Sequence, residues 1–227
     1  MRDGHVPVLK YKDKTCTVVG VYADDLLVTG TEKSAVNAFS AEVSLLSIKD
    51  LVVVNKFLGL RIQLDGSNGS VLDQEVTIDL LLKEFGMESA NGVRTPTGDE
   101  RNEDNEDDLD YLPTRSAKCD SSVKTFQSLV GSLLWIERCK RPDICFAVHK
   151  ATRQTHKPTS KDWKTSKRIL RYLKISKGLK FHLNGVGSTT EDIRIECWSD
   201  ADFAADKADS KSGSGCVLTM DSAVFLW

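Results

Sequence analysis

The sequence predicts an α+β protein, because short β-rich runs alternate with stretches whose apolar residues recur at three- and four-residue steps. Two acidic residues interrupt the first β-rich run, and a helical middle section separates it from a second β-rich group at residues 193–227. With 227 residues, 40% hydrophobic and 28% charged, the chain can bury the core of one large domain or of two small ones. The composition by itself indicates no function.

The first predicted element is a β-hairpin at residues 15–30. A β-rich run precedes Asp24 and Asp25 and an apolar run follows them, which places both carboxylates at the tip. Adjacent carboxylates repel each other unless solvent or a cation relieves them. The tip is therefore either an ordinary polar turn or a site for a hard divalent cation. Thr31 is the predicted N-cap of the helix that follows.

A second hairpin and a second amphipathic helix come next. Residues 57–64 and 70–72 are predicted strands on either side of a turn at 66–69. The apolar residues of the stretch 78–85 lie on one side of a helix, which ends at Gly86.

Charge is distributed unevenly over the second half of the chain. Residues 99–110 hold eight acidic residues and one arginine, whereas residues 136–181 hold 14 lysines and arginines against three acidic residues. The net charge of −2 therefore does not reveal that the chain has one acidic and one basic segment. Because the apolar pattern vanishes between about 95 and 122, we expect a solvated linker there.

Three helices and a meander are predicted after the linker. Two short buried helices cover 126–135 and 144–155, and a third begins after Thr159 or Ser160 and runs to about Lys177. The β-rich tail is typical of a three-stranded meander. Since no helix follows to cover its last apolar residues, we expect this meander to be the least stable part of the chain.

The third of these helices carries a row of cations beside an apolar stripe. Lysine and arginine bind a phosphate backbone by releasing counterions, without reading base sequence. The alternative is a merely solvated helix face. The cations of this basic row are Lys161, Lys164, Lys167, Arg168, Arg171 and Lys174.

Cysteine usage and hydropathy bear on location. The six cysteines form no CxxC pair, and no run approaches the roughly 20 apolar residues of a membrane span. The first residues lead into no apolar leader region. We therefore expect an intracellular protein, cytoplasmic or nuclear and not secreted, with reduced thiols and no membrane partner.

A series of motifs resembles, in order, those of the copia-type reverse transcriptases of LTR retrotransposons. Residues 18–30, VVGVYADDLLVTG, are similar to the family's YVDDLLITG hairpin. The tail motifs SDADF and KSGSG resemble the opening of the family's ribonuclease H domain. Between them the series continues with KDL at 49–51, FLG at 57–59, FGM at 85–87, TP at 95–96, SLVGSLL at 128–134, RPDI at 141–144 and RILRYLK at 168–174.

The resemblance implies a division of the chain. The parts would be the palm remainder with its YADD hairpin and thumb at 1–98, an acidic linker at 99–122, a helical basic connection at 123–190, and the first antiparallel strands of a ribonuclease H-like fold at 191–227.

The resemblance also implies a chemistry. Asp24 and Asp25 would bind Mg²⁺ in the polymerase site and Asp200 in the ribonuclease H site, with an RNA/DNA template–primer or hybrid duplex as partner. The remaining acidic ligands would come from polyprotein segments missing from this chain. We therefore expect an inactive fragment of an RNA-directed DNA polymerase and ribonuclease H. The alternatives are a non-catalytic nucleic-acid-binding remnant or adopted protein, and a small metal-dependent hydrolase that uses these three aspartates together.

Overall fold

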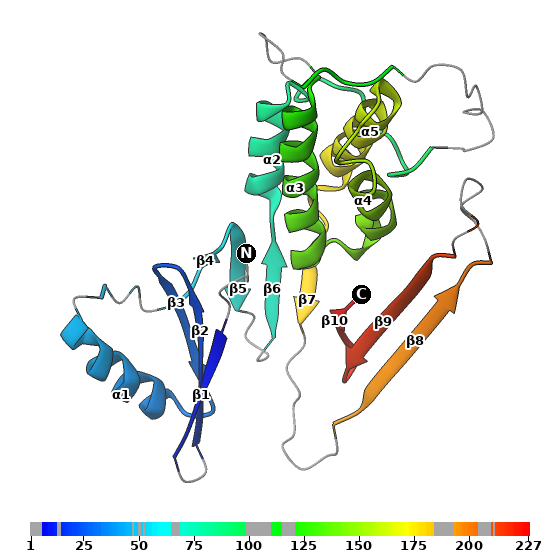
Figure 1. Cartoon of the computed structure of the whole chain (residues 1–227). Coiled ribbons are helices and arrows are strands. Elements are labelled where there is room, and N and C mark those ends of the chain that lie inside the picture. The colour runs from blue at the N-terminus through cyan, green and yellow to red at the C-terminus, as the bar shows by residue number, and fades with distance from the viewer. Residues whose placement is uncertain are drawn as a thin grey trace. The chain divides into compact units, whose positions relative to one another are not determined.

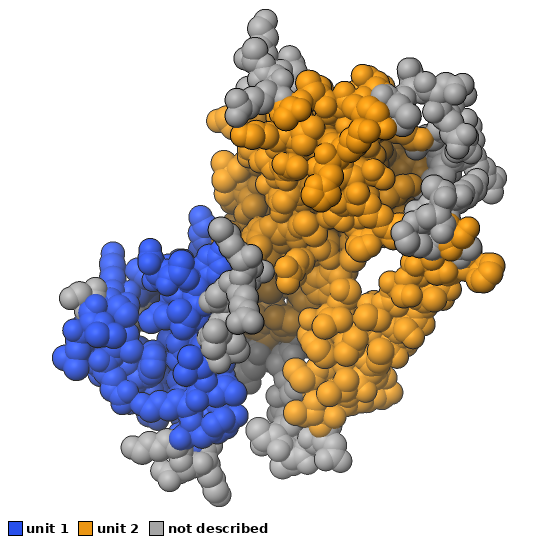
Figure 2. Space-filling model, viewed as in Figure 1, with its two compact units in different colours: residues 1–57 blue, residues 58–227 orange. Residues whose placement is uncertain are grey.

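The computed structural model describes residues 6–12, 15–46, 48–49, 51, 53–64, 69–98, 110–114, 121–183, 193–203, 210 and 212–227. They belong to two compact units, residues 1–57 and 58–227, shown in blue and orange in Figure 2. Helices and antiparallel sheets both occur, which confirms the predicted α+β class (Figure 1). Over the described ranges, no helix is long and apolar enough to cross a membrane.

Unit 1 is a three-stranded antiparallel sheet with a helix. The strands lie in the order β1-β2-β3, and Val19 on the central strand is buried. Lys10 on β1 forms an ion pair with Glu42 on the helix at 2.8 Å. The elements are β1 (Val6–Lys12), β2 (Thr15–Tyr22), β3 (Asp25–Gly30), α1 (Lys33–Val43), η1 (Ser44–Leu46) and the short β4 (Lys56–Phe57).

The predicted cap of the first helix is wrong by one residue. Glu32 is the N-cap of α1 and makes no side-chain capping hydrogen bond. The hydroxyl of Thr31 instead accepts a hydrogen bond from the backbone N–H of Cys16 at 3.1 Å. Thr31 therefore ties the end of the hairpin to β2, a non-local contact that the local cap pattern does not reveal.

Unit 2 begins with a small antiparallel sheet. Strand β5 (Leu60–Leu64) pairs with β6 (Ser70–Asp73), as predicted, although most of the predicted turn at 66–69 lies outside the described residues. Strand β7 (Phe181–Leu183), which was not predicted, pairs with β6 on its other side. This pairing brings the chain after the last helix back beside β6.

Four helices pack into one hydrophobic core. Helices α2 and α3 run side by side in Figure 1, with α4 and α5 beside them. Helix α2, which precedes the predicted linker, thus shares its core with helices that follow it. The helical elements are α2 (Glu75–Glu84), α3 (Val123–Lys140), η3 (Pro142–Ile144), α4 (Cys145–Thr152) and α5 (Ser160–Ser176). Fully buried core residues include Ile78, Leu129, Leu133, Ile144, Val148, Ile169, Leu170 and Leu173.

Part of the predicted linker is not solvated. Leu112 is buried beside Phe126 and Val130, and its backbone N–H donates to the carbonyl of Pro158 at 2.9 Å. Of the predicted linker at 99–122, residues 99–109 and 115–120 lie outside the described part.

Helix α5 begins with a capping box. The hydroxyl of Thr159 accepts from the backbone N–H of Asp162 at 3.2 Å, and the carboxylate of Asp162 accepts from the backbone N–H of Thr159 at 2.8 Å. This confirms the predicted start of the helix. The reciprocal bonds fix the first turn, and with it the position of the basic row.

The predicted three-stranded meander is confirmed. Its strands β8 (Ile195–Ala201), β9 (Ser214–Met220) and β10 (Ala223–Leu226) lie in the order β10-β9-β8. Asp221 and Ser222 have φ values of 49° and 69°, in the left-handed region that a two-residue hairpin turn uses. The carboxylate of Asp221 accepts the backbone N–H of Arg194 at 3.0 Å, so the turn is also tied to the chain before β8.

Candidate functional site

The two acidic residues of the first hairpin lie at its tip, as predicted. Strands β2 and β3 are paired up to Tyr22 opposite Asp25, so Ala23 and Asp24 form the turn. Ala23 has a φ of 47°, the left-handed conformation that two-residue hairpin loops require. Asp24 and Asp25 are both exposed. A paired backbone on either side therefore presents two adjacent carboxylates to solvent.

This tip provides part of a cation site. A hard divalent cation takes about six oxygen ligands, some of them water, so two carboxylates can supply a fraction of one shell. Among the described residues, no group of three or more His, Cys, Asp or Glu side chains is placed to hold a metal ion. The residues present on the tip thus do not make a complete magnesium site by themselves.

Asp200 lies near the end of β8, opposite Gly215 on β9. Its Oδ1 accepts the backbone N–H of Ala201 at 2.9 Å, and the side chain is exposed. Small residues surround it in a surface hollow of about 410 Å³, which gives a ligand room to approach. The lining residues are Ser199, Asp200, Ala201, Ser214, Gly215 and Cys216.

The six cations of the basic row are placed in two different ways. Lys161 and Lys164, near the start of α5, are exposed, and the Nζ of Lys167 lies 5.0 Å from the centroid of the Trp163 ring. The other three cations, Arg168, Arg171 and Lys174, face a segment of the same unit that precedes α3. Within the row, Lys161 and Lys164 are exposed, whereas Lys167, Arg168, Arg171 and Lys174 are half-buried.

We call residues 90–95 the strap, because its acceptors run along α5. The Nη2 of Arg168 donates to the hydroxyl of Thr95 at 3.0 Å, and the Nε of Arg171 donates to the carbonyl of Asn91 at 2.6 Å. The Nζ of Lys174 donates to the carbonyl of Ala90 at 2.8 Å. The helical spacing of the cations was visible in the sequence, whereas nothing in it indicated what covers them.

A buried arginine joins the end of α3 to the end of α5. Arg141 is only 2% exposed, and its Nε and Nη2 both donate to the carboxylate of Asp143, at 2.8 and 2.7 Å. The same guanidinium donates to the backbone carbonyl and hydroxyl of Ser176. Tyr172 donates its hydroxyl to Asp143 at 2.8 Å. The sequence analysis treated residues 141–144 only as a family motif and did not predict this arrangement.

Burial and hydrogen bonding have opposite effects on the pKa of Asp143. Burial by itself would raise the pKa of Asp143, but the hydrogen bonds from Arg141 and Tyr172 outweigh it and hold the pKa below its usual range. Lys140 lies next to this pair, 3% exposed, and donates to the carbonyl of Leu179 at 2.5 Å. Burial, with repulsion from Arg141, lowers the pKa of Lys140 to about 8. These charges hold the helices together rather than facing a ligand.

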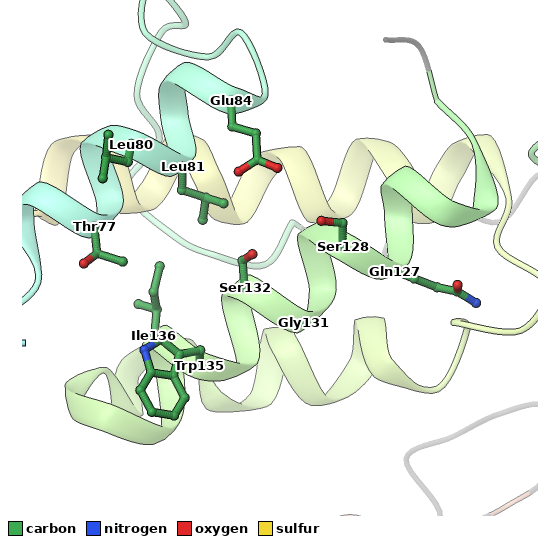
Figure 3. A pocket seen from close by; sticks show the side chains of 10 residues that line it. All are labelled: Thr77, Leu80, Leu81, Glu84, Gln127, Ser128, Gly131, Ser132, Trp135 and Ile136. Atoms are coloured by element: carbon green, nitrogen blue, oxygen red, sulfur yellow. The ribbon is translucent and has the colours of Figure 1, made fainter. Parts of the chain in front are cut away.

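Figure 3 shows an open groove of about 460 Å³ between α2 and α3. Gln127, Gly131 and Trp135 line one side at four-residue steps along α3. Glu84 is the only charged residue among those lining it, so the groove itself has no cation to attract phosphate. The remaining lining residues are Thr77, Leu80, Leu81, Ser128, Ser132 and Ile136.

Comparison with known proteins places the chain in a family. The family described as "Reverse transcriptase (RNA-dependent DNA polymerase)" matches residues 7–99. An uncharacterized mitochondrial protein of Arabidopsis thaliana is 30% identical over 91% of this chain and 80% of its own length. The Retrovirus-related Pol polyprotein from transposon TNT 1-94 of Nicotiana tabacum is 28% identical over 96% of this chain. The one from transposon RE2 of Arabidopsis thaliana is 28% identical over 91%.

The chain belongs to the reverse transcriptase family of copia-type retrotransposon Pol polyproteins, which confirms the resemblance of its motifs. It spans 16% of the length of the tobacco polyprotein and 13% of the RE2 polyprotein. No solved structure matches the chain.

Proposed function

We propose that the chain is the part of an RNA-directed DNA polymerase that carries the catalytic palm hairpin. The exposed Asp24-Asp25 pair on the paired β2–β3 hairpin carries this proposal. In two-metal phosphoryl transfer, divalent ions stabilise the attacking and leaving oxygens, and carboxylates hold those ions. When Mg²⁺ is bound, Asp24 and Asp25 supply ligands from one hairpin, and carboxylates of other polyprotein segments supply the rest.

The remaining parts follow the division implied by the family. We assign residues 1–98 to palm and thumb, 123–190 to the helical connection and 191–227 to the ribonuclease H-like part. In the last of these, Asp200 is the proposed metal ligand. Its place in an open hollow near a strand end supports this role, since a metal and a phosphodiester both need access.

The proposed partner is a template–primer or an RNA/DNA hybrid duplex. The exposed position of Lys161 and Lys164 on the first half of α5, with Lys167 nearby, supports contact with phosphates. Binding should be independent of base sequence and should weaken steeply with salt, because the contacts are made to the backbone.

Primer extension tests the polymerase assignment. With primer, template and Mg²⁺, the purified chain should extend no primer, because the hairpin supplies too few ligands for two metal ions. The matched control is the double variant Asp24→Asn, Asp25→Asn. Incorporation by the wild-type chain above that control would contradict the proposal that the chain is inactive by itself.

The alternative of a non-catalytic nucleic-acid-binding protein makes a different prediction. In that case duplex binding would be insensitive to Mg²⁺ and to the Asp24→Asn, Asp25→Asn variant. If the carboxylates hold metal against phosphates, Mg²⁺ should strengthen duplex binding by the wild type more than by the variant. Equal effects of Mg²⁺ on the two proteins would favour the remnant. Mg²⁺-dependent hydrolysis that both Asp200→Asn and the Asp24→Asn, Asp25→Asn variant abolish would favour the small hydrolase.

We also propose a cytoplasmic or nuclear location. The cysteines that the structure describes are free thiols, which is the state expected in a reducing compartment. Microscopy of the chain fused to a fluorescent protein would test the location, and accumulation in the secretory pathway would contradict it.

A further inference from the structure

The second half of the basic row differs from the other cations of unit 2 in how its charge is compensated. Arg141 is paired with the carboxylate of Asp143, and Lys177 with that of Asp79. The hydrogen-bond acceptors of Arg168, Arg171 and Lys174 are instead a hydroxyl and two backbone carbonyls. Within the described ranges, no carboxylate pairs with these three cations, so their charge is not neutralised there.

The strap itself cannot supply the missing negative charge. Residues 90–95 read ANGVRT, with no acidic residue and one arginine, Arg94. The strap therefore brings an additional positive charge to a helix face that already holds three. A cationic donor is attracted more strongly to a charged phosphate oxygen than to a neutral hydroxyl or carbonyl oxygen. A phosphodiester is thus a better partner for this face than the strap.

One donor under the strap lacks a partner. The Nε of Arg168 is inaccessible to solvent and makes no hydrogen bond within the described part of the chain. A guanidinium that donates through only some of its nitrogens can form a fork with a phosphate, using two parallel N–H groups. Arg168 therefore gains a hydrogen bond if a phosphate takes the place of Thr95.

The strap lies close to α5 only because residue 92 is glycine. A Cβ added to Gly92 would lie 2.0 Å from the Cγ2 of Ile175 and 3.3 Å from its Cβ. Ile175 is β-branched and helical, so its χ1 is restricted and the methyl group cannot easily turn away. Any side chain at position 92 must lift the strap from this face.

We propose that Arg168, Arg171 and Lys174 form a cryptic phosphate-binding row that the strap covers and that a nucleic-acid backbone uncovers by displacing it. The inference rests on the proposed nucleic-acid partner and extends it. Lys161, Lys164 and Lys167 meet the duplex first. Arg168, Arg171 and Lys174 then exchange the neutral acceptors of the strap for phosphate oxygens. This doubles the number of cations in contact with the duplex. In this state α5 presents its whole basic row to one strand.

A reversible lock tests the displacement directly. In the double variant Gly92→Cys, Ile175→Cys the two Cβ atoms would lie near the 3.5–4.5 Å separation typical of a disulfide. The probe is a fluorescein-labelled 20-base-pair RNA/DNA hybrid of mixed sequence, titrated by anisotropy at several salt concentrations. The oxidised form should bind about tenfold more weakly than the reduced form, because the disulfide prevents the strap from leaving the three cations. Its slope of log K against log salt should be shallower by roughly 2.7, because three cations no longer reach phosphate.

Release of the strap should have the opposite effect. Gly92→Ala should bind the hybrid more tightly than wild type, while Gly178→Ala, where an added Cβ meets no atom within 4 Å, should bind like wild type. Adding Arg168→Gln, Arg171→Gln and Lys174→Gln to Gly92→Ala should remove the gain. Wild-type protein exposed to the same oxidant controls for the other thiols.

The outcomes separate this inference from the proposed partner. Equal affinity and equal salt slope for the oxidised and reduced lock, with measurable binding, would overturn the cryptic row and leave nucleic-acid binding intact. Absence of binding by wild type, the reduced lock and Gly92→Ala together would overturn both. Should Gly92→Ala fail to fold, the lock alone decides, since its two forms are compared in one protein.

Discussion

The helical core of unit 2 and its terminal meander bury their side chains very differently. Ile78, Leu133 and Leu170 from three helices are fully buried. On the meander, Ile195 and Trp198 of β8 are 64% and 53% exposed. The helices therefore specify their packing through one shared core, whereas the backbone pairing of the meander brings little apolar burial with it. Order in the meander must depend on its few attachments.

One of those attachments is Trp227. Its Nε1 donates to the buried carboxylate of Glu137 on α3 at 2.9 Å, and its ring centroid lies 5.8 Å from that of Phe181 on β7. From the sequence we expected Trp227 to be uncovered, and this prediction was wrong. Phe225 and Leu226 do remain 49% and 47% exposed. The meander thus reaches the helical core through its last residue, by a hydrogen bond and an aromatic contact.

The largest effect should come from removing the buried arginine that pairs with Asp143. Arg141→Ala leaves Asp143 and the carbonyl of Ser176 without their main donor, and we expect a loss of about 3 kcal/mol in the free energy of unfolding. Urea denaturation measures it. Arg138→Ala, an exposed arginine on the same helix, is the matched control and should cost less than about 0.5 kcal/mol. Similar costs for the two variants would show that the core does not depend on this pair.

The buried lysine of the core should give the next largest effect, through pH. Lys140 has its pKa lowered to about 8 in the folded state, against 10.5 for an ordinary lysine. Between these values the unfolded chain binds more protons, so the folded state gains stability as pH rises. Relative to Lys140→Met, the wild-type unfolding free energy should increase from pH 8 to 10.5 by about 2 kcal/mol, less than the full shift because the site relaxes.

The cysteines of the same region titrate in the opposite direction. Burial raises the pKa of Cys139 and of Cys145 to about 11, so each favours unfolding as pH rises above 9. Both thiols are present in the wild type and in Lys140→Met, and their effect cancels in the difference. Lys164→Met, at an exposed lysine of α5, is measured as the matched control. If the difference in unfolding free energy between wild type and Lys140→Met does not change with pH, Lys140 is exposed to water in the folded protein.

Elements with local signals were predictable from the sequence. The hairpin around Asp24 and Asp25 is defined by residues within a few positions of its turn, and the start of α5 by Thr159 and Asp162 three residues apart. Both kinds of pattern act through short-range hydrogen bonds. The family resemblance then gave the chemistry that the acidic tip alone left open.

Features that depend on distant partners were not predictable. Strand β7 pairs with β6 across more than a hundred residues, and neither strand indicates the other. The burial of Arg141 depends on the end of α5, and the covering of Arg171 depends on the carbonyl of Asn91. A backbone carbonyl has no sequence signature. Spacing therefore identified the basic row but could not show that half of it is occupied.

A smaller effect is expected from weakening the attachment of the meander. Trp227→Phe keeps an aromatic ring beside Phe181 but removes the donor to Glu137, which should cost about 1 kcal/mol. Amide hydrogen exchange of residues 223–226 should accelerate, while that of α3 changes little. Phe203→Ala, at a residue that is 96% exposed, should leave both rates unchanged. Unchanged protection of 223–226 in Trp227→Phe would show that the meander does not depend on this attachment.

The smallest effect on stability should come from substituting Asp200, the proposed metal ligand of the meander. Asp200 is exposed, and within the described residues its carboxylate accepts only the neighbouring N–H of Ala201. An amide oxygen can accept the same bond, so Asp200→Asn should change the free energy of unfolding by less than about 0.5 kcal/mol. Asp143→Asn removes the negative charge that pairs with the buried guanidinium of Arg141 and should cost more. A carboxylate that can be neutralised without loss of stability is available for a ligand. A loss above about 1 kcal/mol for Asp200→Asn would instead assign this residue to holding the end of β8.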